Sequence, residues 1–170
     1  MNVIWSAAIQ TEHGAFTALF SERGLAEISF PDRPCPAVAK GDVPKQWKEQ
    51  TADALRSVLG GEQPAKLPPL DLSKGSEFQQ KVWRALLEIP AGETRSYGEI
   101  AAAVGAPGAA RAVGTACGAN PIPVLVPCHR VLAAQKKLGG FSAGLKWKRL
   151  LLEREALRGK EVTLLLDVVG

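Results

Sequence analysis

The segment from Asn120 to Val131, which reads NPIPVLVPCHRV, constrains the fold of this chain more than any other stretch. Its three prolines, at positions 121, 123 and 127, fix the backbone φ angle and hold the run extended and rigid. The apolar residues between them deliver a thiol next to an imidazole. Such accurate placement suits a nucleophile, because a reacting group gains most when it is held in one geometry.

The thiol of Cys128 is followed directly by His129 and Arg130. A neighbouring histidine or cation lowers the pKa of a thiol and supplies thiolate at neutral pH, so these two residues are the expected helpers of Cys128. In an arbitrary Cys-His pair, a buried thiol beside a core histidine is the commoner outcome. The chain has only two histidines, and His13 falls in a predicted hairpin turn, which leaves His129 as the candidate base.

Composition places the chain among ordinary globular proteins. It has 170 residues, of which 46% are hydrophobic and 22% charged, enough for one domain or two small lobes. No stretch approaches the ~20 apolar residues of a membrane span, and the N-terminus lacks a signal-peptide pattern, so we expect a cytoplasmic protein. Cys35, Cys117 and Cys128 form no C-x-x-C pair, which favours reduced thiols and no bound metal.

The formal net charge of +4 is uneven along the chain. Residues 1–85 are neutral, whereas residues 94–152 carry eight basic side chains and one acid, Glu99. A basic second half favours an anionic partner such as nucleic acid, and a solvated basic face is the other interpretation. Charge alone does not decide between them.

The first part of the chain predicts a small antiparallel sheet covered by a helix. Strands are expected over Asn2–Gln10, Ala15–Phe20 and Leu25–Phe30, with turn residues between them. A helix follows from about Pro44 to Leu59 and stops at two glycines. The segment from Gly60 to Gly75, rich in Pro, Gly and Lys, reads as a linker between two lobes.

The second part predicts helices with defined starts. Ser76 and Ser96 each precede a Gln or Glu by three residues, the pattern of a capping box, and Pro90 ends the first of these helices. A third helix runs from about Gly108 to Gly118 and carries Arg111. Two short helices joined by a tight turn match a helix-turn-helix, although helical hairpins without DNA function are commoner.

These segments resemble the O6-alkylguanine-DNA alkyltransferases, most nearly the bacterial members. The resemblance rests on PCHRV, on the flanking RAVGTACGANPIPVLV and GGFSAGLKWKRLLLERE, and on FQQKVWRALLEIPAGETRSYGEI upstream. It implies an α+β protein with a small ribonuclease-H-like antiparallel-sheet lobe over residues 1–72. An all-α, winged-helix-like catalytic lobe with a helix-turn-helix is then expected over residues 73–158. Residues 159–170 form a tail to which the resemblance assigns no role.

The resemblance also implies a role for each catalytic residue. Cys128 would be the thiolate that takes the alkyl group, with His129 removing its proton through a bound water and Glu155 orienting His129. Tyr97 would donate a proton to the leaving guanine. Asn120 would brace the turn before the active site.

A second group of residues would bind the substrate. Arg111 would fill the gap in the base stack while the damaged nucleotide rotates out of a duplex bound through its minor groove. Ser142 would hydrogen-bond the base oxygen. The remaining pocket residues implied by the resemblance are Cys117, Pro123, Val131 and Gly139. Phe141 departs from the family, in which many members have tyrosine at this position.

The implied function is direct-reversal DNA repair: one irreversible alkyl transfer per molecule from O6-alkylguanine, with O4-alkylthymine as a second candidate substrate. The resemblance implies no cofactor and a monomer that binds double-stranded DNA. Some members bind zinc in the first lobe, but Cys35 and His13 are the only such ligands here, so we expect no metal.

Three alternatives remain to be weighed. A non-catalytic protein that binds alkylated lesions is the first, and retention of Cys128 argues against it. A DNA-binding regulator that uses only the helix-turn-helix is the second. A cysteine hydrolase is the third, and it would turn over repeatedly where an alkyltransferase stops.

Overall fold

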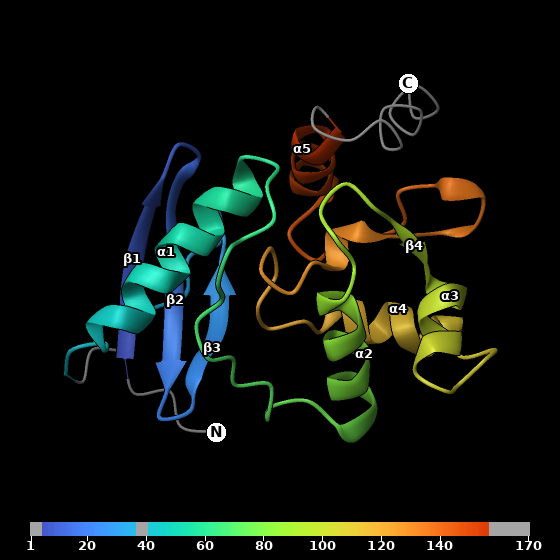
Figure 1. The fold of residues 1–170 in the computed structure, drawn as a ribbon, viewed down its shortest axis with the longest axis horizontal. Helices are drawn as coiled ribbons and strands as arrows, with labels where there is room; N and C mark the ends of the chain where they lie inside the picture. Colours follow the sequence, from blue (N-terminus) through green and yellow to red (C-terminus); the bar gives the residue numbers. More distant parts are fainter. Residues whose placement is uncertain (1–4, 37–40, 157–170) are drawn as a thin grey trace.

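A computed structural model describes residues 5–36 and 41–156, which form two lobes side by side (Figure 1). The tail 159–170 and the start of the first predicted strand lie outside the described residues. The elements, in chain order, are β1 (Trp5–Thr11), β2 (Gly14–Ser21), β3 (Gly24–Ser29), α1 (Lys45–Leu59), α2 (Glu77–Leu87), β4 (Arg95–Ser96), α3 (Tyr97–Ala103), α4 (Ala110–Gly118), η1 (Cys128–Arg130), β5 (Val131–Leu132), η2 (Ala134–Lys136) and α5 (Leu145–Ala156).

The first lobe is an antiparallel meander in the order β1-β2-β3, which confirms the predicted sheet. Ile9 pairs with Phe16 across the first ladder, and Ala18 pairs with Ile28 across the second. Each hairpin turn uses a glycine with positive φ, Gly14 or Gly24, because a side chain is strained in that conformation. Along β2, alternate residues are fully buried in the core: Phe16, Ala18 and Phe20.

Helix α1 covers one face of this sheet (Figure 1). It starts at Lys45, directly after Pro44, and buries Leu55 and Val58. The chain that follows α1 passes very close to α5. If Gly61, whose φ is +82°, carried a Cβ atom, that atom would lie 2.1 Å from the carbonyl oxygen of Arg154. Only glycine allows the chain after α1 to approach α5 this closely.

The segment from Gly60 to Gly75, predicted as a linker, joins α1 to α2, and its second half is bound to the edge of the sheet. The N–H of Leu25 in β3 donates to the carbonyl of Pro69 at 2.8 Å, and the N–H of Asp71 donates to the carbonyl of Leu25 at 2.7 Å. Leu70 thus forms a parallel bridge with Leu25. The exposed edge of β3 offers unpaired backbone groups, and the segment satisfies them.

The carboxylate of Asp71 fixes this segment to the sheet. It is 3% exposed and accepts hydrogen bonds from the hydroxyls of Ser21 and Ser73, each at 2.5 Å. Burial would raise the pKa of Asp71, but these hydrogen bonds outweigh burial and hold the pKa below its usual value.

The second lobe is helical apart from a two-residue parallel pair, in which Arg95 of β4 lies opposite Val131 of β5. Both predicted capping boxes are present, at Ser76 and Ser96. Helix α4 begins at Ala110 and not at Gly108, because Gly108 has a φ of +88° and cannot be helical. Helices α3 and α4 pack against each other as the predicted helix-turn-helix.

One hydrophobic core runs through both lobes, from Phe16 and Phe20 in the sheet to Trp83 on α2 and Ile122 beyond α4. The N–H of Ile28 in β3 donates to the carbonyl of Pro121 at 2.9 Å. The edge of the sheet therefore supports the segment that leads to Cys128.

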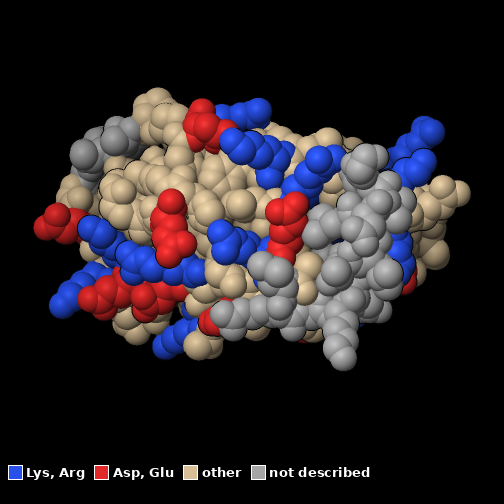
Figure 2. Space-filling model, turned by 90° about the horizontal axis from the view of Figure 1, so that it is seen from above, with Lys and Arg blue, Asp and Glu red and all other residues tan. Residues whose placement is uncertain are grey.

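The face of the molecule that is seen from above carries both acidic and basic side chains (Figure 2). In the view from above, most visible acidic side chains lie over the first lobe (Figure 2). No helix in residues 5–36 or 41–156 is both long and apolar enough to cross a membrane.

We predict that Asp71→Ala lowers the free energy of unfolding by about 1–3 kcal/mol, because it leaves the buried Ser21 hydroxyl without its acceptor and removes the hydrogen bonds to Ser73. Asp53→Ala is the matched control, since the Asp53 side chain is 81% exposed and forms an ion pair with the exposed Arg56. Its effect should stay within about 0.5 kcal/mol. Urea unfolding followed by tryptophan fluorescence measures both; equal effects would show that Asp71 does not fix the segment.

Candidate active site

The segment from Asn120 to Pro127 is a compact turn and not the extended run that the prolines predicted. The Nδ2 group of Asn120 donates to the carbonyl of Val126 at 2.8 Å, while its Oδ1 accepts from the N–H of Ile122 at 3.0 Å. Val124 adopts a φ of +76°, which is rare for a β-branched residue. The prolines fix single φ angles, but the buried backbone groups need partners, and the Asn120 amide supplies them by folding the chain back.

This turn presents Cys128 at the start of the short helix η1, in the wall of a pocket of about 250 Å³. The thiol residue is 4% exposed. The pocket brings together residues from α3, α4, η1 and the loop before α5: Tyr97, Gly114, Cys117, Gly118, Cys128, Gly140, Phe141 and Ser142. Four expected residues, Cys128, Cys117, Tyr97 and Ser142, therefore meet in one pocket.

Behind Cys128, a buried ion pair joins η1 to α5. Nε2 of His129 lies 3.0 Å from Oε1 of Glu155. The guanidinium of Arg130 donates to both carboxylate oxygens of Glu155, its shortest bond measuring 2.7 Å. A further donor of Arg130 reaches the carbonyl of Ile89 at 2.6 Å, which ties the pair to the end of α2.

The protonation of this group follows from its burial and charges. Burial would raise the pKa of Glu155, but His129 and Arg130 outweigh burial and lower the pKa to about 2, so the carboxylate is ionised. An ionised carboxylate only accepts hydrogen bonds, and Nε2 of His129 therefore carries the proton. Nδ1 of His129 is left as an acceptor. Burial also lowers the pKa of His129, which keeps the ring neutral.

The charge that faces Cys128 comes from a residue that sequence reasoning missed. Burial raises the pKa of the Cys128 thiol, while a hydrogen bond with Asn120 and the ammonium of Lys148 act in the opposite direction. Arg130, expected to help the thiol, is instead paired with Glu155. Lys148 lies on α5 and is fully buried, but the sequence showed it only as one of several lysines in a basic stretch.

The other expected residues occupy distinct positions. A Cβ at Gly139 would lie 3.1 Å from the Tyr97 hydroxyl, so Gly139 lies against the pocket. Arg111 is exposed on α4. Pro123 and Val131 do not line this pocket: Pro123 borders a separate hollow, and Val131 is fully buried within the β4–β5 pair. Turning the proline segment into a compact loop points Pro123 towards the sheet.

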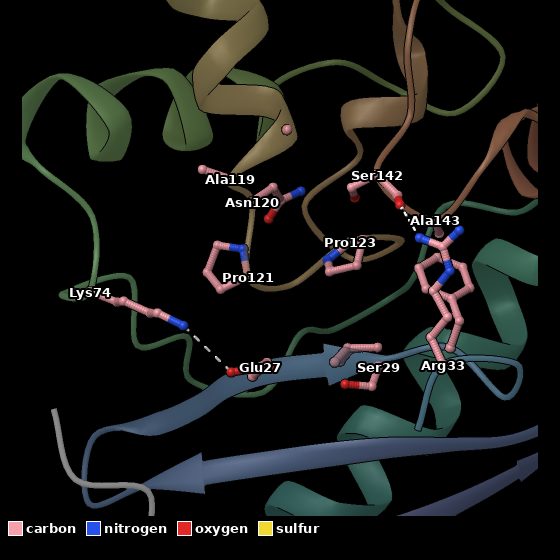
Figure 3. Close-up of a pocket in the computed structure, with 13 residues that line it drawn as sticks. Glu27, Ser29, Arg33, Lys74, Ala119, Asn120, Pro121, Pro123, Ser142 and Ala143 are labelled. Carbon is pink, nitrogen blue, oxygen red and sulfur yellow. Dashed lines mark hydrogen bonds and ion pairs between the residues drawn. The ribbon is translucent and has the colours of Figure 1, made fainter. Parts of the chain in front are cut away.

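That separate hollow, of about 270 Å³, lies between β3 and the end of α4 (Figure 3). Lys74 and Glu27 form an ion pair of 3.7 Å at one side. At the other side, the guanidinium of Arg33 donates to the carbonyl of Ser142 at 2.6 Å. Ser142 borders both this hollow and the Cys128 pocket, so the first lobe contacts the pocket loop directly.

Within the described residues, no three His, Cys, Asp or Glu side chains gather as metal ligands would. Cys35 is half-buried and belongs to a loop, and the ring of His13 packs against Trp147. These two residues do not form a zinc site with any third ligand that the structure describes.

Comparisons with known proteins agree on one family. The profile of the 6-O-methylguanine DNA methyltransferase DNA-binding domain matches residues 77–157. The methylated-DNA–protein-cysteine methyltransferase of Methanosarcina acetivorans is 40% identical over 161 residues, covering 89% of this chain and 98% of the relative. The chain belongs to the methylated-DNA–protein-cysteine methyltransferase family.

Two mycobacterial comparisons extend this result. The Mycobacterium tuberculosis H37Rv methylated-DNA–protein-cysteine methyltransferase is 55% identical over 115 residues, covering 68% of this chain and 69% of the relative. The crystal structure of Mycobacterium tuberculosis OGT in complex with DNA matches 97% of this chain and 100% of that chain, with a TM-score of 0.75 and 41% identity. The likeness to these family members therefore includes the first lobe, where sequence alone showed only a general character.

We predict that Glu155→Ala lowers the free energy of unfolding by about 3–5 kcal/mol, because Arg130 would remain buried without its counter-charge. Glu153→Ala, at an exposed position on the same helix, is the control and should change it by less than about 0.5 kcal/mol. Thermal and urea unfolding measure both. The pKa of Glu155 is lowered in the folded protein, so its contribution is present above about pH 4.3 and is lost as the pH falls towards 2.

Proposed function

We propose that this member of the family repairs alkylated DNA by moving one alkyl group from O6-alkylguanine to the Sγ atom of Cys128. The observation that carries the proposal is the position of Cys128 in the pocket wall, with the His129–Glu155 pair directly behind it. Residues 73–158 would form the DNA-binding and catalytic unit, and residues 1–72 its support. The reaction needs a reduced thiol, which favours action in the cytoplasm.

The acceptor thiol would be activated through His129. Nδ1 of His129 is buried and has no hydrogen-bond partner among the described residues. The tautomer fixed by Glu155 makes Nδ1 a proton acceptor, and one water molecule between Nδ1 and Sγ would complete a path for the thiol proton. Glu155 stays ionised and stabilises the imidazolium that forms, as the acid of a hydrolytic triad does.

The displacement itself forms one bond and breaks one. The lone pair of the thiolate attacks the alkyl carbon, an Sγ–C bond forms, and the bond between that carbon and O6 breaks. The electron pair leaves with the guanine, which needs a proton. Tyr97 lines the pocket and is the proposed donor: burial, with both neighbouring cysteines, raises the pKa of Tyr97 to about 12, so its hydroxyl is protonated at neutral pH.

The product explains why the reaction stops after one turnover. A thioether is a poor leaving group, and the thiol at Cys128 is consumed in forming it. The reaction requires no electron carrier or added nucleophile, because the alkyl group moves directly from oxygen to sulfur. The alkylated chain is the end product, with O4-alkylthymine as a second candidate substrate.

Binding to double-stranded DNA would use α3 and α4, the helix-turn-helix. The exposed Arg111 on α4 would enter the base stack while the alkylated nucleotide rotates into the pocket. Small residues around it, among them Gly108 and Ala112, allow close approach to the minor groove. A crystal structure of Mycobacterium tuberculosis OGT holds DNA, which supports this assignment.

We predict that the protein gains the mass of one CH2 unit when it is mixed with duplex DNA that contains one O6-methylguanine, because a methyl group replaces the thiol hydrogen. Peptide mapping should place the methyl on Cys128. Cys128→Ala should gain none, while Cys117→Ala should still accept the group. A gain that persists in Cys128→Ala would reject the proposed acceptor, and tight binding without any gain would indicate a lesion-binding protein.

We predict that Arg111→Ala slows methyl transfer from duplex DNA by about tenfold, which corresponds to about 1.4 kcal/mol. The cause is the loss of the side chain that replaces the rotated base. Alkylation of Cys128 by iodoacetamide should be unchanged, because Arg111 does not line the pocket. Arg56→Ala removes one positive charge from the first lobe and serves as the charge control. Equal slowing by both variants would show that Arg111 acts only through its positive charge.

A further inference from the structure

Lys148 is a buried cation that the proposed reaction does not use. Its side chain is fully buried on α5. Among the described residues, no carboxylate forms an ion pair with it. A buried ammonium is costly unless it is hydrogen-bonded or has an opposite charge nearby, so its position requires a reason.

The hydrogen bonds of Lys148 join two parts of the acceptor site. Nζ donates to the carbonyl of Val131 at 2.8 Å and to the carbonyl of Gly140 at 3.2 Å. Val131 follows Cys128 by three residues and opens β5. Gly140 belongs to the loop that lines the Cys128 pocket. One ammonium therefore holds the pocket loop at a fixed place relative to the nucleophile.

Lys148 is also the uncompensated charge near the thiols. Cys128 of η1 and Cys117 of α4 are the ionisable groups that couple to it most, and both favour its charged form. Burial acts against that charge and lowers the pKa of Lys148 to about 8.

The other charged and titratable groups around the site do not replace it. Arg130 and Glu155 form an ion pair in which their charges offset each other. His129 is neutral, because its pKa is lowered, and Tyr97 of α3 is protonated at neutral pH. Among the residues that the structure describes, Lys148 is then the cation whose charge favours the thiolate form of Cys128.

We propose that Lys148 is a positioning residue of the acceptor site, whose ammonium holds the pocket loop against β5 and stabilises the Cys128 thiolate. The inference rests on the proposed function for its biological meaning. Its physical content, a thiol made more acidic by a buried lysine, is measurable without DNA.

Arg33 provides a matched variant for the first half of this role. Its guanidinium donates to the carbonyl of Ser142 and so holds the same loop from the first lobe (Figure 3). Arg33 is exposed, so its charge is screened by solvent. An Arg33 variant therefore loosens the loop without removing a buried charge, which separates the two effects.

The test measures the rate of Cys128 carbamidomethylation by iodoacetamide against pH, with peptide mass spectrometry as the readout. Cys35, half-buried in a loop of the first lobe, is the internal reference thiol. Lys148→Met should move the Cys128 profile upward by about one pH unit and lower its rate at pH 7 about tenfold relative to Cys35. Arg33→Gln should leave this profile in place. Lys146 is exposed on the same helix, two residues away, and Lys146→Met should change neither the pH profile of Cys128 nor its rate at pH 7.

An unchanged Cys128 profile in folded Lys148→Met overturns the proposal, as does an equal shift in Arg33→Gln. Because Lys148→Met can fail to fold, a second measurement uses the unchanged chain: lysine ¹³Cε resonances are titrated before and after carbamidomethylation of Cys128. One lysine should titrate below the others, and its midpoint should fall once Cys128 can no longer form a thiolate. No shift in that midpoint also overturns the proposal.

These results separate the inference from the proposed function. A chain that shows both lysine effects but accepts no methyl group from DNA keeps the Lys148 assignment and loses the repair function. A chain that accepts the methyl group on Cys128 but shows neither effect keeps the function and loses the assignment.

Discussion

The buried carboxylate of Glu155 is the interaction on which the acceptor site depends. It binds His129 and Arg130 together, so two consecutive residues after Cys128 are fixed to α5. An unpaired charge in this position would cost several kcal/mol, so Arg130 and Glu155 are stable there only as a pair. The same contact sets the tautomer of His129 and leaves Nδ1 as an acceptor, which is the role that the proposed proton transfer requires. Stability and reactivity are therefore supplied by one group.

The first lobe contributes by supporting the turn in front of the nucleophile. Its edge strand β3 binds the carbonyl of Pro121, and Arg33 binds the carbonyl of Ser142 in the pocket loop. The core that continues from the sheet into the second lobe leaves little freedom between the two. The described part of the first lobe thus keeps the geometry of the pocket fixed.

Burial of the site disfavours the ionised form of the Cys128 thiol. A thiol that is 4% exposed is a weaker acid than a free thiol, because the low-polarity surroundings disfavour the thiolate. Asn120 and Lys148 offset that effect with a hydrogen bond and a charge. Burial also excludes water, which strengthens the hydrogen bond from Asn120 and the charge interaction with Lys148. The same burial that disfavours the thiolate therefore makes these two groups more effective in stabilising it.

Local sequence determined much of this protein: the three strands, both capping boxes, and the candidate thiol with a histidine beside it, since each depends on residues close together in the chain. It also identified Glu155, but only through resemblance to a family. Tertiary structure decided the rest. The proline segment became a turn because buried backbone groups found the Asn120 amide. Arg130 turned to Glu155 and Lys148 to the pocket, since the fold, not the spacing along the chain, determines which charges are buried together.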